Sequence, residues 1–246
     1  MTELLPYPRF SIAERDRRWA AVRKLMRERG IDIIVVPNNT GHSTDFQANA
    51  RYLSHVGGGG DADIAVVFPL EGEVSAVATT AKPRWPCVQD WVSDVREARR
   101  AYGRATVERL KELSADGKRI GITGLGAGTR TPEGTILYNF WRLMRETFPK
   151  AEFVDATGLL DEVRFVKSEE EISVLRKSTE IIEKGVEAKI AHARPGVVDW
   201  VVWAEAMAAM MRHGSEIPVH QHWLSGKNPT RTLTRPTFRP LERGDL

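Results

Sequence analysis

The stretch SGKNPTRTLTRPTFRPLERGDL, residues 225–246, decides how the rest of the sequence is interpreted. Each of its prolines lacks a backbone N–H and biases the preceding residue toward extended geometry, so the stretch predicts an extended, turning segment. Arginine recurs every four residues from Arg231 to Arg243, but the prolines exclude the helix that would turn this spacing into a basic stripe. Residues 242–246 are typical of a polar turn before a strand. We therefore expect the sequence to be part of a longer protein.

The composition is that of an ordinary globular protein, large enough for one large domain or two modest ones: 246 residues, 41% hydrophobic and 28% charged. A net charge of +3 gives little reason to expect a polyanionic partner, so we predict no nucleic-acid partner. The single cysteine, Cys87, excludes an internal disulfide and fits a reducing compartment. Because we find neither a signal peptide nor a run of about 20 apolar residues, we expect a cytoplasmic protein with no membrane partner.

Short β-branched runs alternate with amphipathic patterns up to about residue 156, and this alternation predicts an α/β domain. Strands are expected at residues 31–36, 64–69, 74–80, near 91–95, at 119–123 and at 151–154. Helices are expected at 11–29, in a short piece ending at Leu53, at 103–114 and after Thr131-Pro132. In that last helix threonine would be the N-cap and proline the first helical residue.

The first predicted helix, residues 11–29, begins with the capping box of Ser11 and Glu14. Its arginines alternate with acidic residues, which favours a solvated face and leaves a docking surface as the alternative. The charged residues are Arg15, Arg17, Arg18, Arg23, Arg27 and Arg29, with Glu14, Asp16 and Glu28.

A second domain is predicted to follow the α/β domain. Residues 157–166 are expected to form a connector, and Ser168 with Glu171 forms a second capping box in front of a helix at about 169–192. A turn at residues 194–196 then leads to a helix at about 199–213, antiparallel to the first. We assign residues 1–158 to the α/β domain and residues 159–246 to the beginning of the second domain.

Few residues in the sequence are candidates for a catalytic, metal-ligating or ligand-binding role. His220 and His222 lie two apart in a predicted strand at 217–225, so both would lie on one face. Metal ligation, lining of a ligand pocket and structural hydrogen bonding remain open for this pair, although no carboxylate or cysteine lies nearby at a suitable spacing. Asp61 follows four glycines and would form either a mobile anionic lip or a polar approach to a hairpin.

Two other motifs give only weak evidence for a functional site. The glycines Gly124, Gly126 and Gly128 follow a predicted strand, but their spacing departs from the dinucleotide-binding fingerprint, so we interpret them as a flexible turn. Cys87 has no convincing histidine partner for a nucleophile role.

A series of short motifs, taken together in this order and spacing, resembles the creatinase/Xaa-Pro aminopeptidase/prolidase family across essentially the whole sequence. They are Phe10-Ser11 with the arginine-rich helix into Ile31-Asp32-Ile33, then Arg51-Tyr52-Leu53, VRFVKSEEEI at 163–172, Arg194-Pro195-Gly196, Ser225-Gly226-x-Asn228 and Arg239-x-Leu241-x-x-Gly244-Asp245-Leu246.

The resemblance implies an α/β N-terminal domain, with a mixed sheet flanked by helices. The first helices and a strand of an α+β pita-bread catalytic domain would follow. It also implies a hydrolase that acts on a C–N bond of a peptide or small molecule, and a homodimer. The family's metal ligands fall after residues 244–246, so we expect a divalent metal (Mn, Co, Zn or Fe) in the full-length protein and no metal or catalytic residue in this chain.

Two departures from the family pattern favour a divergent branch. By creatinase's spacing the family's substrate-binding histidine falls on Leu233, and leucine cannot transfer a proton. Where creatinase's glycine-rich loop supplies an arginine for a carboxylate substrate, this sequence has Asp61, which would attract a cation. We assign His222, His220 and Asp61 to substrate binding. The alternative is a non-catalytic dimerisation or binding module of the same fold.

Overall fold

The computed structural model describes residues 10–38, 48–56, 63–79, 91–128, 131–216, 223–227 and 236–245. The chain divides into two compact units, one ending at Ser168 and the other beginning at Glu169. The boundary expected after residue 158 lies inside a helix of the first unit, α5 (Thr157–Phe165). No helix in the described residues is both long enough and apolar enough to cross a bilayer.

The first unit is built on a mixed six-stranded sheet in the order β4-β3-β2-β1-β5-β6, which confirms the predicted α/β class. The pairs β1/β2 and β2/β3 are antiparallel, and the other three pairs are parallel. The strands are β1 (Ile33–Val36), β2 (Ile64–Pro69), β3 (Ser75–Ala78), β4 (Asp94–Glu97), β5 (Arg119–Ile122) and β6 (Glu152–Asp155). The strand expected near residues 91–95 thus begins later, at Asp94.

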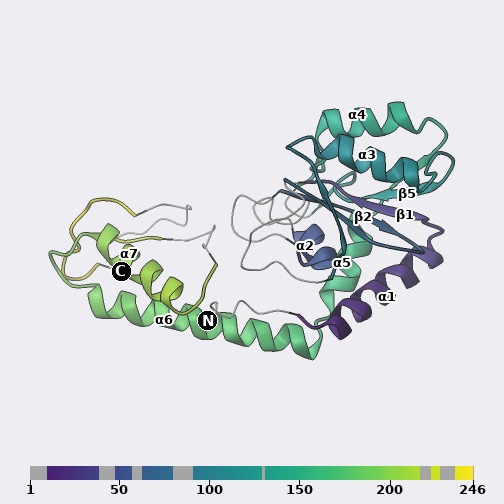
Figure 1. Cartoon of the computed structure of the whole chain (residues 1–246). Helices are drawn as coiled ribbons and strands as arrows, with labels where there is room; N and C mark the ends of the chain where they lie inside the picture. The colour runs from purple at the N-terminus through teal and green to yellow at the C-terminus, as the bar shows by residue number, and fades with distance from the viewer. Residues whose placement is uncertain are drawn as a thin grey trace. The chain divides into compact units, whose positions relative to one another are not determined.

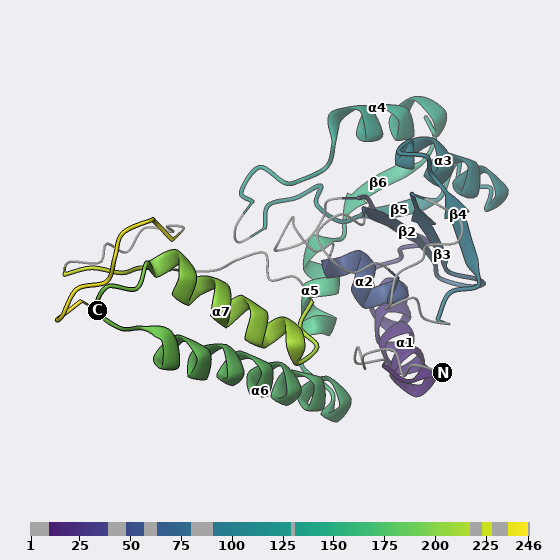
Figure 2. The same ribbon diagram turned by 60° about the vertical axis from the view of Figure 1, so that its left-hand side comes forward.

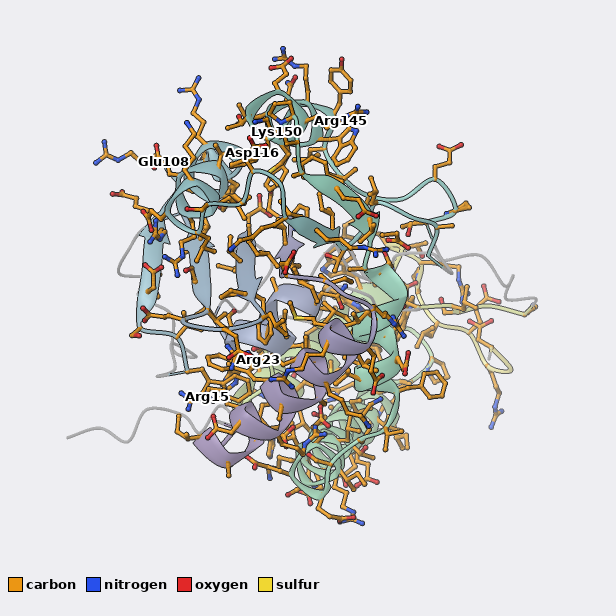
Figure 3. The ribbon with its side chains drawn as sticks, turned by 90° about the vertical axis from the view of Figure 1, so that its right-hand side faces the viewer. Arg15, Arg23, Glu108, Asp116, Arg145 and Lys150 are labelled. Atoms are coloured by element: carbon orange, nitrogen blue, oxygen red, sulfur yellow. The ribbon has the colours of Figure 1, made fainter. Side chains whose placement is uncertain are left out.

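Helices cover both faces of this sheet, which is why its central strands are buried on both sides and consist largely of β-branched residues. On one face lie α1 (Ile12–Glu28), α2 (Ala48–Ser54) and α5, and on the other lie α3 (Tyr102–Glu112) and α4 (Tyr138–Thr147) (Figure 1). Figure 3 shows Arg15 and Arg23 of α1 on one side of the sheet, and Glu108 of α3 with Arg145 of α4 on the other.

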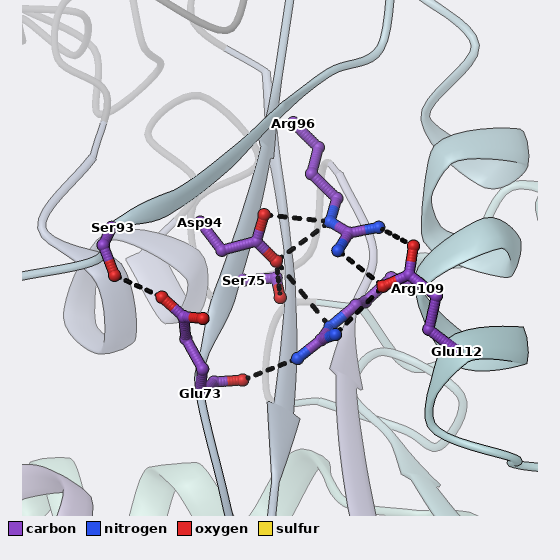
Figure 4. A network of polar contacts seen from close by, with 7 residues as sticks. All are labelled: Glu73, Ser75, Ser93, Asp94, Arg96, Arg109 and Glu112. Atoms are coloured by element: carbon purple, nitrogen blue, oxygen red, sulfur yellow. Dashed lines mark hydrogen bonds and ion pairs between the residues drawn. The ribbon is translucent and has the colours of Figure 1, made fainter.

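A network of ion pairs joins α3 to the edge strand β4 (Figure 4). Arg96 on β4 contacts both carboxylate oxygens of Glu112 at 2.7 Å and also contacts Asp94. Arg109 adds contacts to Glu112 at 3.0 Å and to Asp94 at 3.7 Å. The hydrogen bonds from Arg96 and Arg109 lower the pKa of Glu112 to about 2. Charged side chains on an edge strand also disfavour pairing with a strand of another molecule.

The prediction of a helix starting at Pro132 was wrong, because α4 starts six residues later, at Tyr138. The carbonyl of Gly124 accepts hydrogen bonds from the backbone N–H groups of Thr135 and Ile136, at 2.8 and 3.3 Å. Gly134 adopts a left-handed conformation with φ of 77°, which a helix cannot include. These contacts hold the chain in a loop until Leu137.

The connector expected at residues 157–166 is instead helix α5. The Asp155 carboxylate accepts from the Thr157 backbone N–H at 3.0 Å and from its hydroxyl at 2.6 Å, and so caps the start of the helix. Leu159, Leu160 and Val163 bury one face of it. Asp155 also accepts from the backbone N–H of Gly126 at 3.0 Å. The glycine motif is therefore a turn held against the start of α5.

The close approach at Gly121 on β5 leads to a prediction about stability. A Cβ added there would lie 2.9 Å from the Cβ of Ala156 and 3.3 Å from Ile31. We expect Gly121→Ala to lower the free energy of unfolding by about 1–3 kcal/mol through overpacking. Gly158→Ala on α5 is the matched control: nothing lies within 4 Å of its added Cβ, and it should be neutral or stabilise by up to about 1 kcal/mol. Urea unfolding of both variants tests this, and equal midpoints would contradict it.

The second unit contains the predicted pair of antiparallel helices, α6 (Glu169–His192) and α7 (Asp199–Arg212). The two helices lie side by side (Figure 2). They approach closely at Gly185, where an added Cβ would meet the Cγ of Met210 at 2.9 Å. The expected strand at 217–225 lies mostly outside the described residues, and its last three residues, 223–225, are not in a strand.

Candidate functional site

The three residues assigned to substrate binding, His220, His222 and Asp61, all lie outside the described residues, and so does Leu233. Within the described ranges, no group of three or more histidine, cysteine, aspartate or glutamate side chains is arranged to hold a metal ion. The candidate site in the second unit is therefore built from the described parts of residues 223–245 and the helix start that they contact.

Asp199, the first residue of α7, is the centre of this site. Its side chain is buried, and the residue is 1% exposed. One carboxylate oxygen, Oδ2, accepts hydrogen bonds from the indole N–H of Trp223 at 3.4 Å and from the Ser225 hydroxyl at 3.0 Å. It also accepts from the backbone N–H and the hydroxyl of Thr237, at 3.0 and 2.9 Å. The carboxylate thus joins two separate parts of residues 223–245 to the start of α7.

Burial by itself raises the pKa of Asp199, but the donors of Thr237, Ser225 and Trp223 outweigh it and hold the pKa below its ordinary value. The carboxylate is therefore charged at neutral pH. Because the donors at Oδ2 stabilise its charged form and lower its pKa, the carboxylate is poorly suited to act as a general base. Its chemistry here is that of a structural acceptor.

Backbone hydrogen bonds reinforce the attachment that the Asp199 carboxylate makes. The N–H of Gly196 donates to the carbonyl of Leu241, and the N–H of Leu241 donates to the carbonyl of Val197, both at 2.8 Å. The N–H of Asp199 donates to the carbonyl of Arg239 at 3.0 Å. The Arg-Pro-Gly turn between the helices is thereby paired with residues 239–241, just before the turn that contains Gly244-Asp245.

That second turn is closed by an ion pair between Arg239 and Asp245 at 2.6 Å. Asp245 also accepts from the backbone N–H of Glu242 at 2.7 Å, and the two contacts hold its pKa below the ordinary value. Gly226 has a φ of 128°, and a Cβ added to it would lie 3.7 Å from the Arg239 guanidinium. The Ser-Gly and Gly-Asp motifs therefore lie close together, although they are far apart in the sequence.

A second buried charge lies in the first unit, at Arg18. Its side chain is 3% exposed and pairs with Glu14 at 2.7 Å. The guanidinium lies over the rings of Phe10, Tyr52 and Trp91, with centroid distances of 4.3, 4.2 and 5.1 Å. The interpretation of the helix as a solvated charged face is wrong for Glu14 and Arg18. Because Arg18 is enclosed by its own partners, we interpret it as a structural centre that ties the Arg-Tyr-Leu motif to α1.

The sequence analysis missed both centres. Asp199 could have been noticed as an acidic residue in the first turn of a helix, a favourable position for a carboxylate. Glu14 and Arg18 share a spacing of four with Val22 and Met26, and these four are the buried residues of α1. That spacing places both charges on the buried stripe.

Comparison with known proteins agrees with the family resemblance identified from the sequence. A family model described as the creatinase/prolidase N-terminal domain matches residues 18–166. The chain is 25% identical over 252 aligned positions to creatinase from Bacillus sp., covering 97% of this chain and 56% of that protein. It is 28% identical over 142 positions to the Xaa-Pro dipeptidase of Pyrococcus horikoshii, covering 57% of this chain and 39% of that protein. The chain thus spans about half the length of the curated relatives it matches.

Solved structures show the same fold. The prolidase from Pyrococcus horikoshii OT3 superposes with a TM-score of 0.66 at 18% identity, covering 93% of this chain and 58% of that one. The Xaa-Pro dipeptidase from Bacillus anthracis superposes with a TM-score of 0.68 at 19% identity, covering 94% of this chain and 59% of that one.

Proposed function

This chain belongs to the creatinase/prolidase family, and we propose that it is part of a hydrolase that cleaves a C–N bond of a peptide or small molecule. The observation that carries the proposal is the family match over residues 18–166. In the second unit Arg239 lies beside Gly226 of the Ser-Gly motif and pairs with Asp245 of the Gly-Asp motif, and this arrangement supports it. We further propose that the protein works in the cytoplasm as a homodimer.

The family resemblance implies a divalent metal, but the described residues do not fit one. They include no group of three metal-ligating side chains. The two acids nearest the family's active-site turn, Asp199 and Asp245, are engaged by hydrogen bonds and an ion pair. In the proposed function these residues shape the turn at 242–245. Substrate recognition is assigned to His222, His220 and Asp61.

The first test is the mass of the natural protein. A mass well above the 27.6 kDa of this chain would support a longer enzyme. The natural protein should then be freed of metal, reloaded separately with Mn, Co, Zn and Fe, and assayed with Xaa-Pro dipeptides, creatine and small cationic amides. We expect metal-dependent hydrolysis, with cationic substrates preferred over carboxylates because of Asp61.

Site variants sharpen this test. His222→Ala and Asp61→Asn should raise KM more than they lower kcat, because both residues are proposed to bind substrate rather than to transfer protons. His213→Ala, at the C-terminal end of α7, replaces an exposed histidine whose ring contacts the carbonyl of Ala209 in its own helix, and it serves as the matched control. Absence of hydrolysis by the metal-loaded natural protein on every substrate class would overturn the proposal.

The presence of Leu233 where the family has a histidine favours one alternative, a non-catalytic dimerisation or binding module of the same fold. A natural protein of 27.6 kDa that is stable and dimeric in sedimentation experiments would support this alternative over the enzyme.

A further inference from the structure

A pocket of about 600 Å³ lies where α3 and α4 begin, on one face of the sheet in the first unit. Its wall consists of the first residues of α3 with Arg100 before them, the first residues of α4, and Asn38, which follows β1. The start of each helix presents backbone N–H groups that have no partner within the helix. Neither N-cap residue, Ala101 or Leu137, has a side chain that accepts a hydrogen bond from them.

The described part of the lining is basic and contains no acid. Three arginines take part: Arg100, Arg104 and Arg142. Arg142 pairs with the exposed Glu146 at 3.3 Å, whereas Arg100 and Arg104 make no ion pair or side-chain hydrogen bond with any residue that the structure describes. Two helix N-termini add further positive potential. This combination favours an anion with more than one charged oxygen, as guanidinium groups and helix N-termini do for phosphate.

Asn38 supplies an independent indication of a ligand. The residue is 4% exposed and lines the pocket, and its side-chain oxygen, Oδ1, has no hydrogen-bond partner among the residues that the structure describes. Buried polar groups are nearly always satisfied, so an orphaned amide oxygen beside a pocket indicates a missing donor. An anion cannot supply that donor through its charged oxygens, but a hydroxyl on the same molecule can.

We propose that this pocket binds a small phosphate monoester that also carries hydroxyl groups. The arginines and the helix N-termini would hold the phosphate, and a hydroxyl would donate to Asn38. The apolar side chains of Leu137, Phe140 and Leu143 would pack against the carbon skeleton. This inference does not rest on the proposed hydrolase function, because every residue in it lies in the first unit.

Calorimetry with three probes tests the proposal on the 246-residue chain. Glucose 6-phosphate should bind more tightly than inorganic phosphate, and glucose should not bind at millimolar concentration. Arg104→Gln and Arg142→Gln should each weaken binding of glucose 6-phosphate by about tenfold, because each removes a charge-assisted hydrogen bond. Arg145→Gln is the matched control: Arg145 lies on α4 with Arg142 but over the Trp141 ring, and it is not among the residues that line the pocket, so binding should stay unchanged.

The role of Asn38 is tested separately with Asn38→Ala. This change should bring the affinity for glucose 6-phosphate down to that for inorganic phosphate, while leaving the affinity for inorganic phosphate as it was. Equal affinity of the unaltered chain for both probes would overturn the hydroxyl contact. The absence of any phosphate binding would overturn the site. So would a control variant, Arg145→Gln, that weakens binding as much as Arg104→Gln and Arg142→Gln do.

Discussion

Replacing Arg18 with methionine should lower the free energy of unfolding of the first unit by about 4 kcal/mol, because breaking one partner of a buried ion pair leaves the other charge without full compensation. The side chains of Arg18 and Glu14 are each 3% exposed and lie 2.7 Å apart. The same change removes the guanidinium from the rings of Phe10, Tyr52 and Trp91. Methionine retains much of the side-chain volume, so most of the loss is electrostatic rather than a cavity effect.

Urea unfolding of the full chain, followed by circular dichroism, measures this effect. Lys24→Met is the matched control on the same helix, because Lys24 and Glu28 form an exposed pair at 3.9 Å. Such a pair contributes at most about 0.5 kcal/mol. If Arg18→Met costs no more than Lys24→Met, the buried pair does not stabilise the first unit.

Acid titration provides a second measurement of the same centre. Burial tends to raise the pKa of Glu14, but hydrogen bonds from Arg17 and Arg18 lower it from 4.5 to about 2. A carboxyl group whose pKa is lower in the folded state stabilises the fold above its unfolded pKa, and this stabilisation is lost as the pH falls. The unaltered chain should therefore lose stability between about pH 4.5 and pH 2. Arg18→Met should lose less over that range, so the two proteins should converge on acidification.

Replacing Asp199 with alanine should release residues 223–227 and 236–245 from the start of α7. Its Oδ2 accepts from Trp223, Ser225 and Thr237, and hydrogen bonds to a charged group contribute about 1.5–3 kcal/mol each. Since these bonds share one acceptor and are not additive, we expect a total loss of about 4 kcal/mol. Hydrogen exchange at the Thr237 amide should rise by orders of magnitude, with a smaller change in α3 of the first unit.

Asp199→Asn is the matched variant. All four donors contact Oδ2, and Oδ1 has no hydrogen-bond partner within the described part of the chain. An asparagine that places its oxygen at the Oδ2 position therefore keeps the geometry and loses only the charge. We expect an exchange rate between those of the unaltered chain and Asp199→Ala. Equal Thr237 protection in the alanine variant and the unaltered chain would show that backbone pairing alone holds this region.

The candidate site was predictable only in part. The motifs at Ser225-Gly226 and Gly244-Asp245 were identified from the sequence, and the structure brings them together through Arg239 and Asp199. Neither the ion pair nor the shared carboxylate could be inferred, because the contacting residues are separated by at least six positions and approach only after the helices pair. His220, His222 and Asp61 lie outside the described residues, and their assignment to substrate binding stays a prediction.

The sequence by itself determined the elements whose signal is local: the strands of β-branched residues and the long helices α6 and α7 follow from periodicity and capping within about twenty residues. The tertiary structure alone decided where α4 starts, that residues 157–165 are helical, and that Arg18 is buried. The start of α4 depends on the carbonyl of Gly124, and the burial of Arg18 depends on the ring of Trp91. The helix at 157–165 is capped locally by the carboxylate of Asp155, but it is held in place by the burial of Leu159, Leu160 and Val163 in the core against the sheet. A charge or a helix end is stabilised by whatever packs against it, and that partner is defined only once the chain has folded.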